Sequence, residues 1–285
     1  MTSYTNNREI AILMAVYNGE KYIAQQIDSI IRQSFQDWTL YIRDDGSSDD
    51  TLKIITAYND SRIIATQDFQ GNLGTKNSFL YLLKIVDSQY YMFSDQDDVW
   101  LENKIELSYN KMKETEGKTS FETPILVYTD LMVVDGSLSI IEPSYWKTKR
   151  INPNSYNTYN YISVFTFVTG MTMLFNNSSK KHIFPVHKSA GMHDSWVSTV
   201  IAKHGILIPV MQPTCLYRQH GGNLLGAESK ERQKLSYKIK NISYVYKVNH
   251  EKAKQLKDIG FGSSVKYIYY KTLVFLKRLF YCKSK

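Results

Sequence analysis

YYMFSDQDD, residues 90–98, is a short apolar run that ends in three carboxylates within four residues. An apolar run of this length, bounded by polar residues, is typical of a buried strand. The carboxylates repel one another, so the folded chain needs a compensating cation beside them. A divalent ion such as Mg²⁺ or Mn²⁺ binds through few carboxylates and completes its shell with water and phosphate oxygens. The alternative is a solvated acidic turn that caps the next helix, and the segment alone leaves both open.

Apolar runs and helical patterns alternate on both sides of this segment. Runs typical of strands lie at 10–16, 38–43, 63–66 and 125–130. Apolar residues recur at helical spacing at 21–32, 72–87 and 102–114, and a further helix is expected to end at Tyr58. Single helices between successive strands imply right-handed crossovers. We therefore predict an α/β fold with a mostly parallel sheet flanked by helices.

Two further polar clusters follow predicted strands, AVYNGE at 15–20 and DDGSSDDT at 44–51. In parallel sheets ligands bind beyond the carboxyl ends of the strands, where these clusters are expected to meet residues 94–98. An aromatic ring in the first cluster could stack on a base, and a carboxylate in the second could accept a hydrogen bond from a nucleobase or ribose. Each cluster alone is also explained by turn and helix-cap chemistry.

The alternation loosens after Asp135. We expect a loop at 142–158, a β-rich run at 165–175, a helix at 194–203 and short strands at 206–209 and 214–218. From residue 229 the chain is basic and helical, with apolar residues near helical spacing between 265 and 279. A basic amphipathic helix can lie in a membrane interface. The alternative is a helix that packs on the catalytic domain with its lysines solvated.

Composition indicates an ordinary globular protein, with one sizeable α/β domain and an appendage in 285 residues. The formal charge of +8 favours anionic partners such as phosphorylated substrates, a membrane surface or nucleic acid. Cys215 and Cys282 lie far apart, which argues against a disulfide framework or zinc site and favours a reducing compartment. The polar start of the chain does not resemble a signal peptide, and no apolar stretch reaches transmembrane length. We therefore expect a cytoplasmic location.

The three loops together resemble the family 2 glycosyltransferases, nucleotide-sugar enzymes with the fold called GT-A. The resemblance follows the family's motif order over about residues 8–226. It implies a GT-A catalytic domain at 8–228, with a Rossmann-like nucleotide-binding half, and a basic, aromatic-rich helical extension at 229–285.

The resemblance also implies roles for residues in these loops. Tyr17 and Glu20 would face the nucleotide, and Asp45 would bind the nucleobase. DQDD at 95–98 resembles the family's DxD motif, which would place Asp95 near the ribose and Asp97 on a Mg²⁺ or Mn²⁺ ion.

Later segments carry further roles by the same resemblance. Gly170 begins a segment that resembles the strand lining the acceptor side, and Asp194 corresponds to the catalytic base. His193 stands where the family usually has glutamate. In YRQHGGN, residues 217–223, Arg218 would neutralise phosphate charge and His220 would be a further metal ligand.

The segments DQDDVW, HDSW and YRQHGGN resemble most closely the bacterial rhamnosyltransferases of this family. They imply an inverting transfer of a sugar, such as L-rhamnose from a dTDP donor, to a hydroxyl of a cell-surface polysaccharide or lipid-linked glycan. One base without a carboxylate nucleophile opposite it implies a single displacement. The expected partners are a nucleotide-sugar donor, a glycan or lipid-linked acceptor and, through 229–285, the inner face of the cell membrane.

Three alternatives stay open at this point. The first is a family 2 enzyme with another donor, such as a UDP-hexose. The second is a metal-dependent nucleotidyltransferase, although AVYNGEKY at 15–22 lacks the glycine- and lysine-rich phosphate loop of such enzymes. The third is a nucleic-acid binder. Acidic clusters at three strand ends would repel phosphates, so we expect no nucleic-acid partner.

Overall fold

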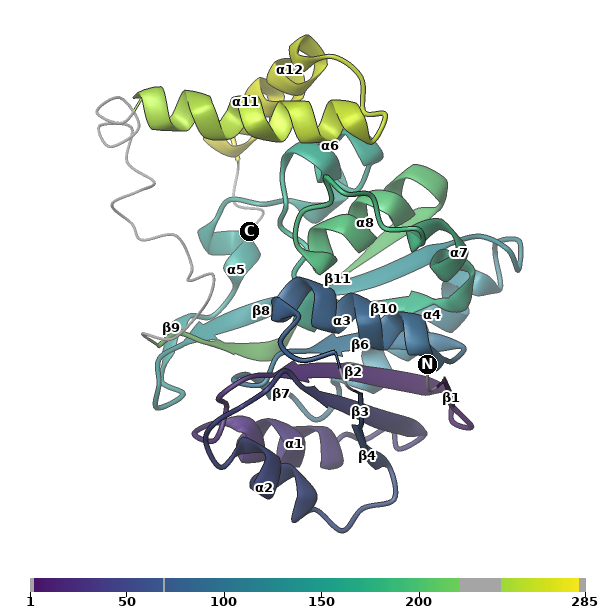
Figure 1. The fold of residues 1–285 in the computed structure, drawn as a ribbon. Helices are drawn as coiled ribbons and strands as arrows, with labels where there is room; N and C mark the ends of the chain where they lie inside the picture. Colours follow the sequence, from purple (N-terminus) through teal and green to yellow (C-terminus); the bar gives the residue numbers. More distant parts are fainter. Residues whose placement is uncertain (1–2, 69, 221–241, 282–285) are drawn as a thin grey trace.

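A nine-stranded mixed sheet runs through the protein, with helices on both of its faces (Figure 1). The computed structural model describes residues 3–68, 70–220 and 242–281. The order across the sheet is β4-β3-β2-β6-β10-β8-β11-β7, with β9 paired to β8. The strands are β2 (Ile10–Val16), β3 (Trp38–Asp44), β4 (Ile63–Thr66), β6 (Tyr90–Ser94), β7 (Val99–Trp100), β8 (Ile125–Val134), β9 (Ile140–Glu142), β10 (Met173–Asn176) and β11 (Ile206–Arg218). A separate pair joins β1 (Tyr4–Thr5) to β5 (Val86–Asp87).

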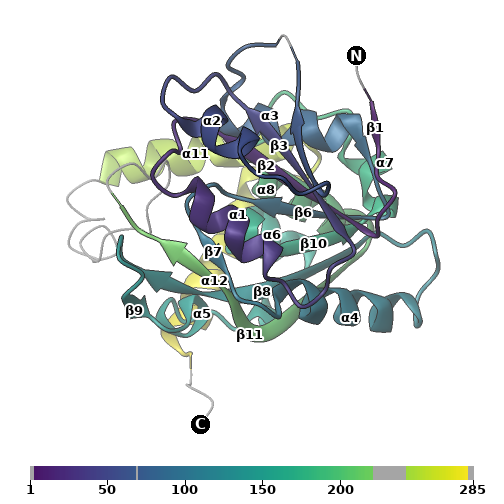
Figure 2. The ribbon, with the colours of Figure 1, turned by 90° about the horizontal axis from the view of Figure 1, so that it is seen from below.

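The helices divide between the two faces of the sheet. One face is covered by α1 (Ile23–Ile31), α2 (Thr51–Thr56) and α4 (Lys104–Glu116). The opposite face carries α3 (Gly74–Ile85), α5 (Tyr145–Thr148), α6 (Tyr159–Val164), α7 (Lys180–Ile183) and α8 (His193–His204). The chain ends in α11 (Ile242–Asp258) and α12 (Ser264–Leu279). Figure 2 shows α1 crossing its face of the sheet in the view from below.

Strand β2 illustrates why the sheet is covered on both sides. Its sequence IAILMAV is almost continuously apolar, as expected of a parallel strand buried on two faces. Successive side chains alternate between the two hydrophobic clusters, Ala11 and Leu13 on the α3 side and Ile12 and Met14 on the α1 side. Strands β4, β3, β2 and β6 are parallel to one another, which confirms the predicted parallel arrangement of this half of the sheet.

The second half of the sheet is less parallel than predicted. β10 runs antiparallel to both neighbours, β6 and β8, and β7 runs antiparallel to β11. Of the predicted β-rich run at 165–175, only the end is a strand; before β10 the chain forms a 3₁₀ turn at Gly170–Thr172. The predicted loop at 142–158 contains α5 and a second 3₁₀ turn at Pro153–Ser155. The two short strands expected at 206–209 and 214–218 are one strand, β11.

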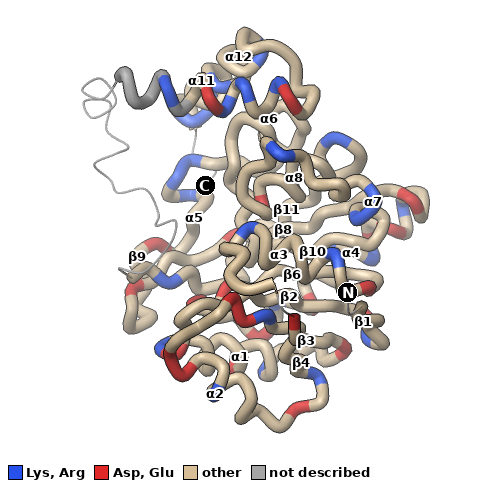
Figure 3. The backbone as a smooth tube through the Cα atoms, in the orientation of Figure 1, with Lys and Arg blue, Asp and Glu red and all other residues tan. Residues whose placement is uncertain are grey.

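The terminal helices pack on the rest of the protein. Ala253, Leu256, Phe261, Tyr267 and Val274 are buried in the same hydrophobic cluster as α3, α6 and α8. Figure 3 shows Lys and Arg spread along these helices, and residues 242–281 hold eight Lys and Arg residues against Glu251 and Asp258. The predicted domain boundary between 228 and 229 lies outside the described residues, so the division into a catalytic domain and an extension stays a prediction.

Candidate functional site

A cavity of about 310 Å³ lies at the carboxyl ends of β2, β3 and β6, where the sequence predicts a ligand site. Its wall contains five of the eight predicted site residues: Tyr17, Asp45, Asp95, Asp97 and Asp194. These residues come from segments far apart in the chain, and the strand order brings them together. The other three, Glu20, Arg218 and His220, are not part of this wall.

The first two polar loops are tied to each other by hydrogen bonds. The backbone N–H of Asn18 donates to Ser47 Oγ at 2.9 Å, and that of Gly19 donates to Thr51 Oγ1 at 2.7 Å. Asn18 has a φ of 47°, a left-handed conformation that asparagine tolerates better than most residues. The pairing fixes the loop that carries Tyr17 against the start of α2.

Glu20 contributes to this pairing rather than to the cavity wall. Its carboxylate accepts a hydrogen bond from the backbone N–H of Asp50 at 3.0 Å. Its own N–H donates to Asp49 Oδ2 at 3.1 Å. In the described structure Glu20 therefore holds the two loops together, and its contact with a nucleotide stays a prediction.

Tyr17 is presented at the mouth of the cavity. Half of its side chain is exposed. Its backbone is clamped by Gln96, because the Tyr17 N–H donates to Gln96 Oε1 at 2.8 Å and Gln96 Nε2 donates to the Tyr17 carbonyl at 3.0 Å. The acidic segment after β6 thus positions the aromatic ring.

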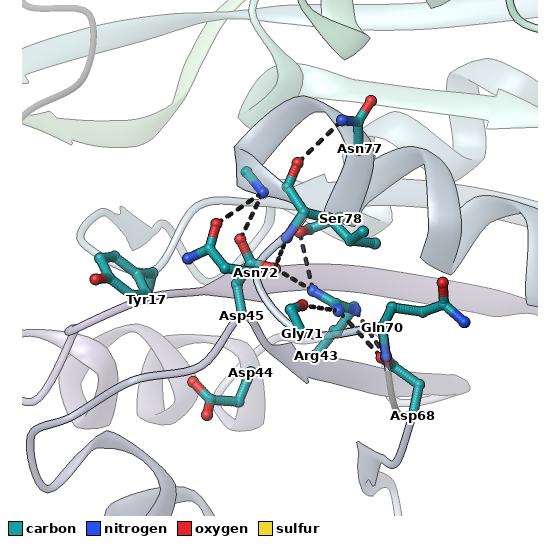
Figure 4. A network of polar contacts seen from close by, with 12 residues as sticks. Tyr17, Arg43, Asp44, Asp45, Asp68, Gln70, Gly71, Asn72, Asn77 and Ser78 are labelled. Carbon is teal, nitrogen blue, oxygen red and sulfur yellow. Dashed lines mark hydrogen bonds and ion pairs between the residues drawn. The ribbon is translucent and has the colours of Figure 1, made fainter.

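Asp45 is buried and fixed by a network around Arg43 (Figure 4). The Arg43 guanidinium donates to Asp45 and to both oxygens of Asp68, at 2.7 and 3.1 Å. The backbone N–H groups of Leu73 and Gly74 donate to the Asp45 carboxylate at 2.7 and 2.8 Å. Since each carboxylate oxygen can accept more than one hydrogen bond, Asp45 keeps capacity for a ligand in the cavity.

The carboxylates after β6 form an electrostatically unfavourable group in the absence of a cation. Burial, with the nearby charges of Asp97 and Asp194, raises the pKa of Asp95 to about 7. Burial also raises the pKa of Asp98 well above its ordinary value, with Asp97 and Asp95 adding to the effect. Such a group favours the binding of positive charge.

Asp97 and His220 form the pair expected to hold a metal ion. Asp97 Oδ2 lies 2.9 Å from His220 Nε2, although the two residues are 123 positions apart. Within residues 3–68, 70–220 and 242–281, no group of three or more His, Cys, Asp or Glu side chains is arranged to hold a metal. This pair fits an ion that takes few protein ligands and its remaining oxygens from water and substrate phosphates. Of the loop that carries His220, residues 221–223 lie outside the described part.

Arg218 lies next to Asp97 and is buried. It is 2% exposed, and its guanidinium donates to the backbone carbonyls of Asp97 and Gly136, both at 2.8 Å, and to Gln25. Its backbone N–H donates to Asp98 Oδ1 at 3.0 Å. Through these bonds Arg218 holds the acidic segment in place, and its predicted contact with phosphate stays a prediction.

Asp194 lies in the first turn of α8 and lines the cavity. Its Oδ1 accepts a hydrogen bond from the backbone N–H of Ser195 at 2.6 Å. An ionised carboxylate in the cavity wall can accept a proton from a bound hydroxyl group.

With this geometry in place, the comparisons with known proteins decide the family. The model of the family described as "Glycosyl transferase family 2" matches residues 11–181, more than half of the chain. The chain belongs to glycosyl transferase family 2. The resemblance predicted from its sequence is therefore confirmed.

Relatives of this glycosyltransferase carry different donor names. The dTDP-rhamnosyl transferase RfbG of Shigella flexneri is 29% identical over 75% of this chain and 74% of its own length. A UDP-glucose-dependent β-1,3-glucosyltransferase of Escherichia coli, WfgD, which acts on α-D-GlcNAc-diphosphoundecaprenol, is 34% identical over 36% of this chain. That match spans only 40% of the WfgD chain.

Solved structures confirm the GT-A glycosyltransferase fold. Staphylococcus aureus TarS, residues 1–349 in complex with UDP-GlcNAc, matches 95% of this chain and 72% of its own, with a TM-score of 0.61 and 17% identity. The mannosyltransferase PcManGT of Pyrobaculum calidifontis, in complex with GDP-Man and Mn²⁺, matches 98% of this chain and 75% of its own, with a TM-score of 0.59 and 11% identity.

Sequence reasoning missed several residues in the cavity wall of this glycosyltransferase. Thr75 and Ser78 line it from the start of α3, and Tyr217 lines it from the end of β11. Thr75 and Ser78 lie outside the polar clusters at strand ends, and Tyr217 belongs to the YRQHGGN segment, in which only Arg218 and His220 were given roles. The network around Asp45 could have been predicted from Arg43. This charged residue lies inside an otherwise apolar strand, where it is rarely buried without partners.

Proposed function

We propose that this family 2 enzyme is an inverting transferase that moves L-rhamnose from a dTDP donor to a hydroxyl of a growing cell-surface polysaccharide or lipid-linked glycan. The observation that carries glycosyl transfer is the cavity itself, which joins Tyr17, Asp45, Asp95 and Asp97 to Asp194 in one wall. The choice of rhamnose is supported by the similarity to RfbG, which extends over three quarters of both chains.

A UDP-hexose is the second candidate donor. The UDP-glucose-dependent enzymes WfgD and WfaP of Escherichia coli are 34% and 36% identical to this chain, higher than RfbG, although over 105 and 98 residues only. The family assignment favours either donor over the nucleotidyltransferase and nucleic-acid-binding alternatives.

In the proposed reaction, the acceptor oxygen forms a bond to the anomeric carbon as the bond from that carbon to the diphosphate oxygen breaks. Asp194 takes the proton of the acceptor hydroxyl, and the nucleoside diphosphate leaves with the bonding electrons. Tyr17 stacks on the base, while Asp45 accepts a hydrogen bond from it. The single displacement inverts the anomeric centre, so a β-linked donor gives an α-glycoside.

Asp97 and His220 would hold a Mg²⁺ or Mn²⁺ ion together with the donor diphosphate, and Arg218 would fix the backbone of Asp97. When bound, the ion would stabilise the negative charge that develops on the leaving diphosphate. Asp95 lies in the same wall and would bind the ribose.

The test is a donor panel that includes dTDP-L-rhamnose and UDP-glucose, each incubated with the protein and Mn²⁺ or Mg²⁺. We expect selective consumption of one donor, or selective binding by calorimetry when the acceptor is missing. Consumption of UDP-glucose but not of dTDP-L-rhamnose would contradict the proposed donor and would still support glycosyl transfer. Failure of every nucleotide sugar and nucleoside diphosphate to bind would contradict glycosyl transfer.

We also propose that α12 lies on the inner face of the cell membrane. Its positions 265, 268, 269, 272, 276 and 279 fall on one helical face. Val265, Ile268 and Leu279 on that face are 75%, 61% and 54% exposed. Lys271, Lys277 and Arg278 lie on the side of the helix that meets the rest of the protein, where they donate to backbone carbonyls at 3.4, 3.0 and 2.9 Å.

The exposed apolar face suits an interfacial helix, while the three basic residues anchor the opposite side of α12 to the protein. The name of WfgD, whose acceptor is attached to a polyprenyl diphosphate, supports the same location. Within the described residues, no helix has the length and apolar character needed to cross a bilayer.

Replacing Ile268 and Leu279 together by glutamate is expected to abolish flotation of the protein with vesicles that contain phosphatidylglycerol. Two charges on the outer face would oppose insertion while leaving the buried residues of α12 unchanged. The control is Phe121→Glu, because Phe121 is 95% exposed on the loop between α4 and β8. Equal flotation of the double variant and the wild type would contradict the proposal. We prefer these substitutions to a deletion of the terminal helices. A deletion would remove buried residues such as Phe261 and Val274 and could disturb the fold.

A further inference from the structure

His193 is a buried polar residue that the proposed reaction leaves unused. It precedes Asp194 at the start of α8, is 4% exposed and forms part of the cavity wall. Neither of its ring nitrogens has a hydrogen-bond partner among the described residues. Buried polar groups almost always have partners, so a pair of unpartnered nitrogens in a cavity wall indicates that a ligand supplies them.

The surroundings of His193 hold its ring in one orientation. The ring stacks on Phe79, with centroids 4.1 Å apart and planes 22° apart. Phe93 meets it edge to face at 5.0 Å. A Cβ added at Gly170 would lie 2.9 Å from His193 Nε2, so glycine at this position leaves the space that the nitrogen occupies.

The protonation state of His193 restricts the kind of ligand. Burial lowers its pKa, and the nearby charge of Asp194 offsets this only in part, so the ring is neutral at pH 7. A neutral imidazole has one N–H donor and one acceptor nitrogen. A hydroxyl group can both donate and accept, whereas phosphate oxygens accept only and are better matched by an imidazolium ion.

We propose that His193 binds a hydroxyl group of a sugar and thereby contributes to the choice of substrate. This inference rests on the proposed glycosyl transfer and deepens it. The hydroxyl belongs either to the sugar of the donor or to the acceptor, and the two sources are separable by experiment. His193 is a specificity-determining residue in this account, and Asp194 remains the base.

The test uses the full chain with the donor that the panel identifies, and the matching nucleoside diphosphate. His193→Phe retains the stacked ring but removes both hydrogen-bonding nitrogens, and His193→Gln restores a donor and an acceptor. If the hydroxyl is on the donor, His193→Phe binds the nucleotide sugar about tenfold more weakly by calorimetry, with unchanged binding of the nucleoside diphosphate. If it is on the acceptor, donor binding is unchanged and the acceptor KM rises by a similar factor.

His193→Gln is expected to recover part of the loss in either case. His204→Phe, at the opposite end of the same helix and outside the cavity wall, is the matched control. A second readout needs no substitution: ¹⁵N resonances of His193 in the wild type are expected to move when the sugar substrate is added, and not with the nucleoside diphosphate alone.

The inference would be overturned if His193→Phe bound the nucleotide sugar as tightly as the wild type and had the same acceptor KM. It would also be overturned if no sugar substrate moved the ¹⁵N resonances of His193. Nucleoside diphosphate binding would then still support the proposed function. If the wild type bound no nucleoside diphosphate at all, the proposed function and the inference would both be overturned.

Discussion

The Asp194→Asn protein is expected to bind its nucleotide sugar as tightly as the wild type and to transfer the sugar about 10²- to 10⁴-fold more slowly. Asparagine has nearly the same shape as aspartate but cannot accept the proton of the acceptor hydroxyl. Its side-chain oxygen can still accept the hydrogen bond that the Ser195 N–H donates to Asp194. The defect should therefore appear in kcat, measured as release of nucleoside diphosphate with acceptor present, and not in calorimetric donor binding.

The control for this variant is Asp258→Asn, which removes a carboxylate of the same kind outside the cavity wall. Asp258 Oδ2 accepts a hydrogen bond from Ser189 Oγ at 3.0 Å. Ser189 lies shortly before the start of α8 in the sequence. We expect near wild-type turnover from it. A turnover of Asp194→Asn within about twofold of the wild type would remove Asp194 from the role of base, and proton transfer to bulk water or to another side chain would have to replace it.

The first half of the fold could be predicted closely because its signals are local. Strands at 10–16, 63–66 and 90–94 begin and end where the apolar runs do. A parallel strand covered on both faces needs such a run, and the intervening helix needs an apolar stripe. The predicted order of strands and helices therefore required no knowledge of distant contacts in this half.

The second half depends on contacts that a local pattern does not reveal. β11 contains Pro209 and Pro213, which are unusual inside a strand, and the sequence predicts two short strands in its place. The structure accommodates Pro213 at irregularities in the pairing with β8, where the register shifts on both sides of it. The antiparallel placement of β10 between β6 and β8 is likewise set by long-range pairing.

The site was predictable to the extent that its residues lie at strand ends. The polar clusters that contain Tyr17, Asp45 and Asp97 could be located because parallel strands present their carboxyl ends at one edge. The roles of these three residues come from the family resemblance and stay predictions. The support around them was not found, because it is built from distant partners. Gln96 was visible only as one polar residue in an acidic run, yet it clamps the backbone of Tyr17.

Asp97→Asn is expected to reduce sugar transfer by at least about 10²-fold at a Mn²⁺ or Mg²⁺ concentration that saturates the wild type. The amide is a weaker ligand for a divalent ion than the carboxylate, and it cannot offset the charge of the ion. For the wild type, a chelator should abolish transfer and weaken donor binding, since the donor diphosphate and the ion are expected to bind together. The measurement is transfer rate as a function of metal concentration.

The metal dependence separates a ligand role for Asp97 from a structural one. If Asp97 and His220 share the ion, Asp97→Asn and His220→Ala each require more metal for half-maximal rate, and added Mn²⁺ restores part of the activity. If Asp97 only stabilises its loop, the rate falls but the half-saturating metal concentration stays that of the wild type. The short contact between Asp97 Oδ2 and His220 Nε2 predicts the first pattern, because an ion that replaces their shared proton would hold both atoms. If no chelator affected the activity of the wild type, Asp97 and His220 would only form a hydrogen bond and would not bind an ion. Another group would then have to stabilise the charge of the leaving diphosphate.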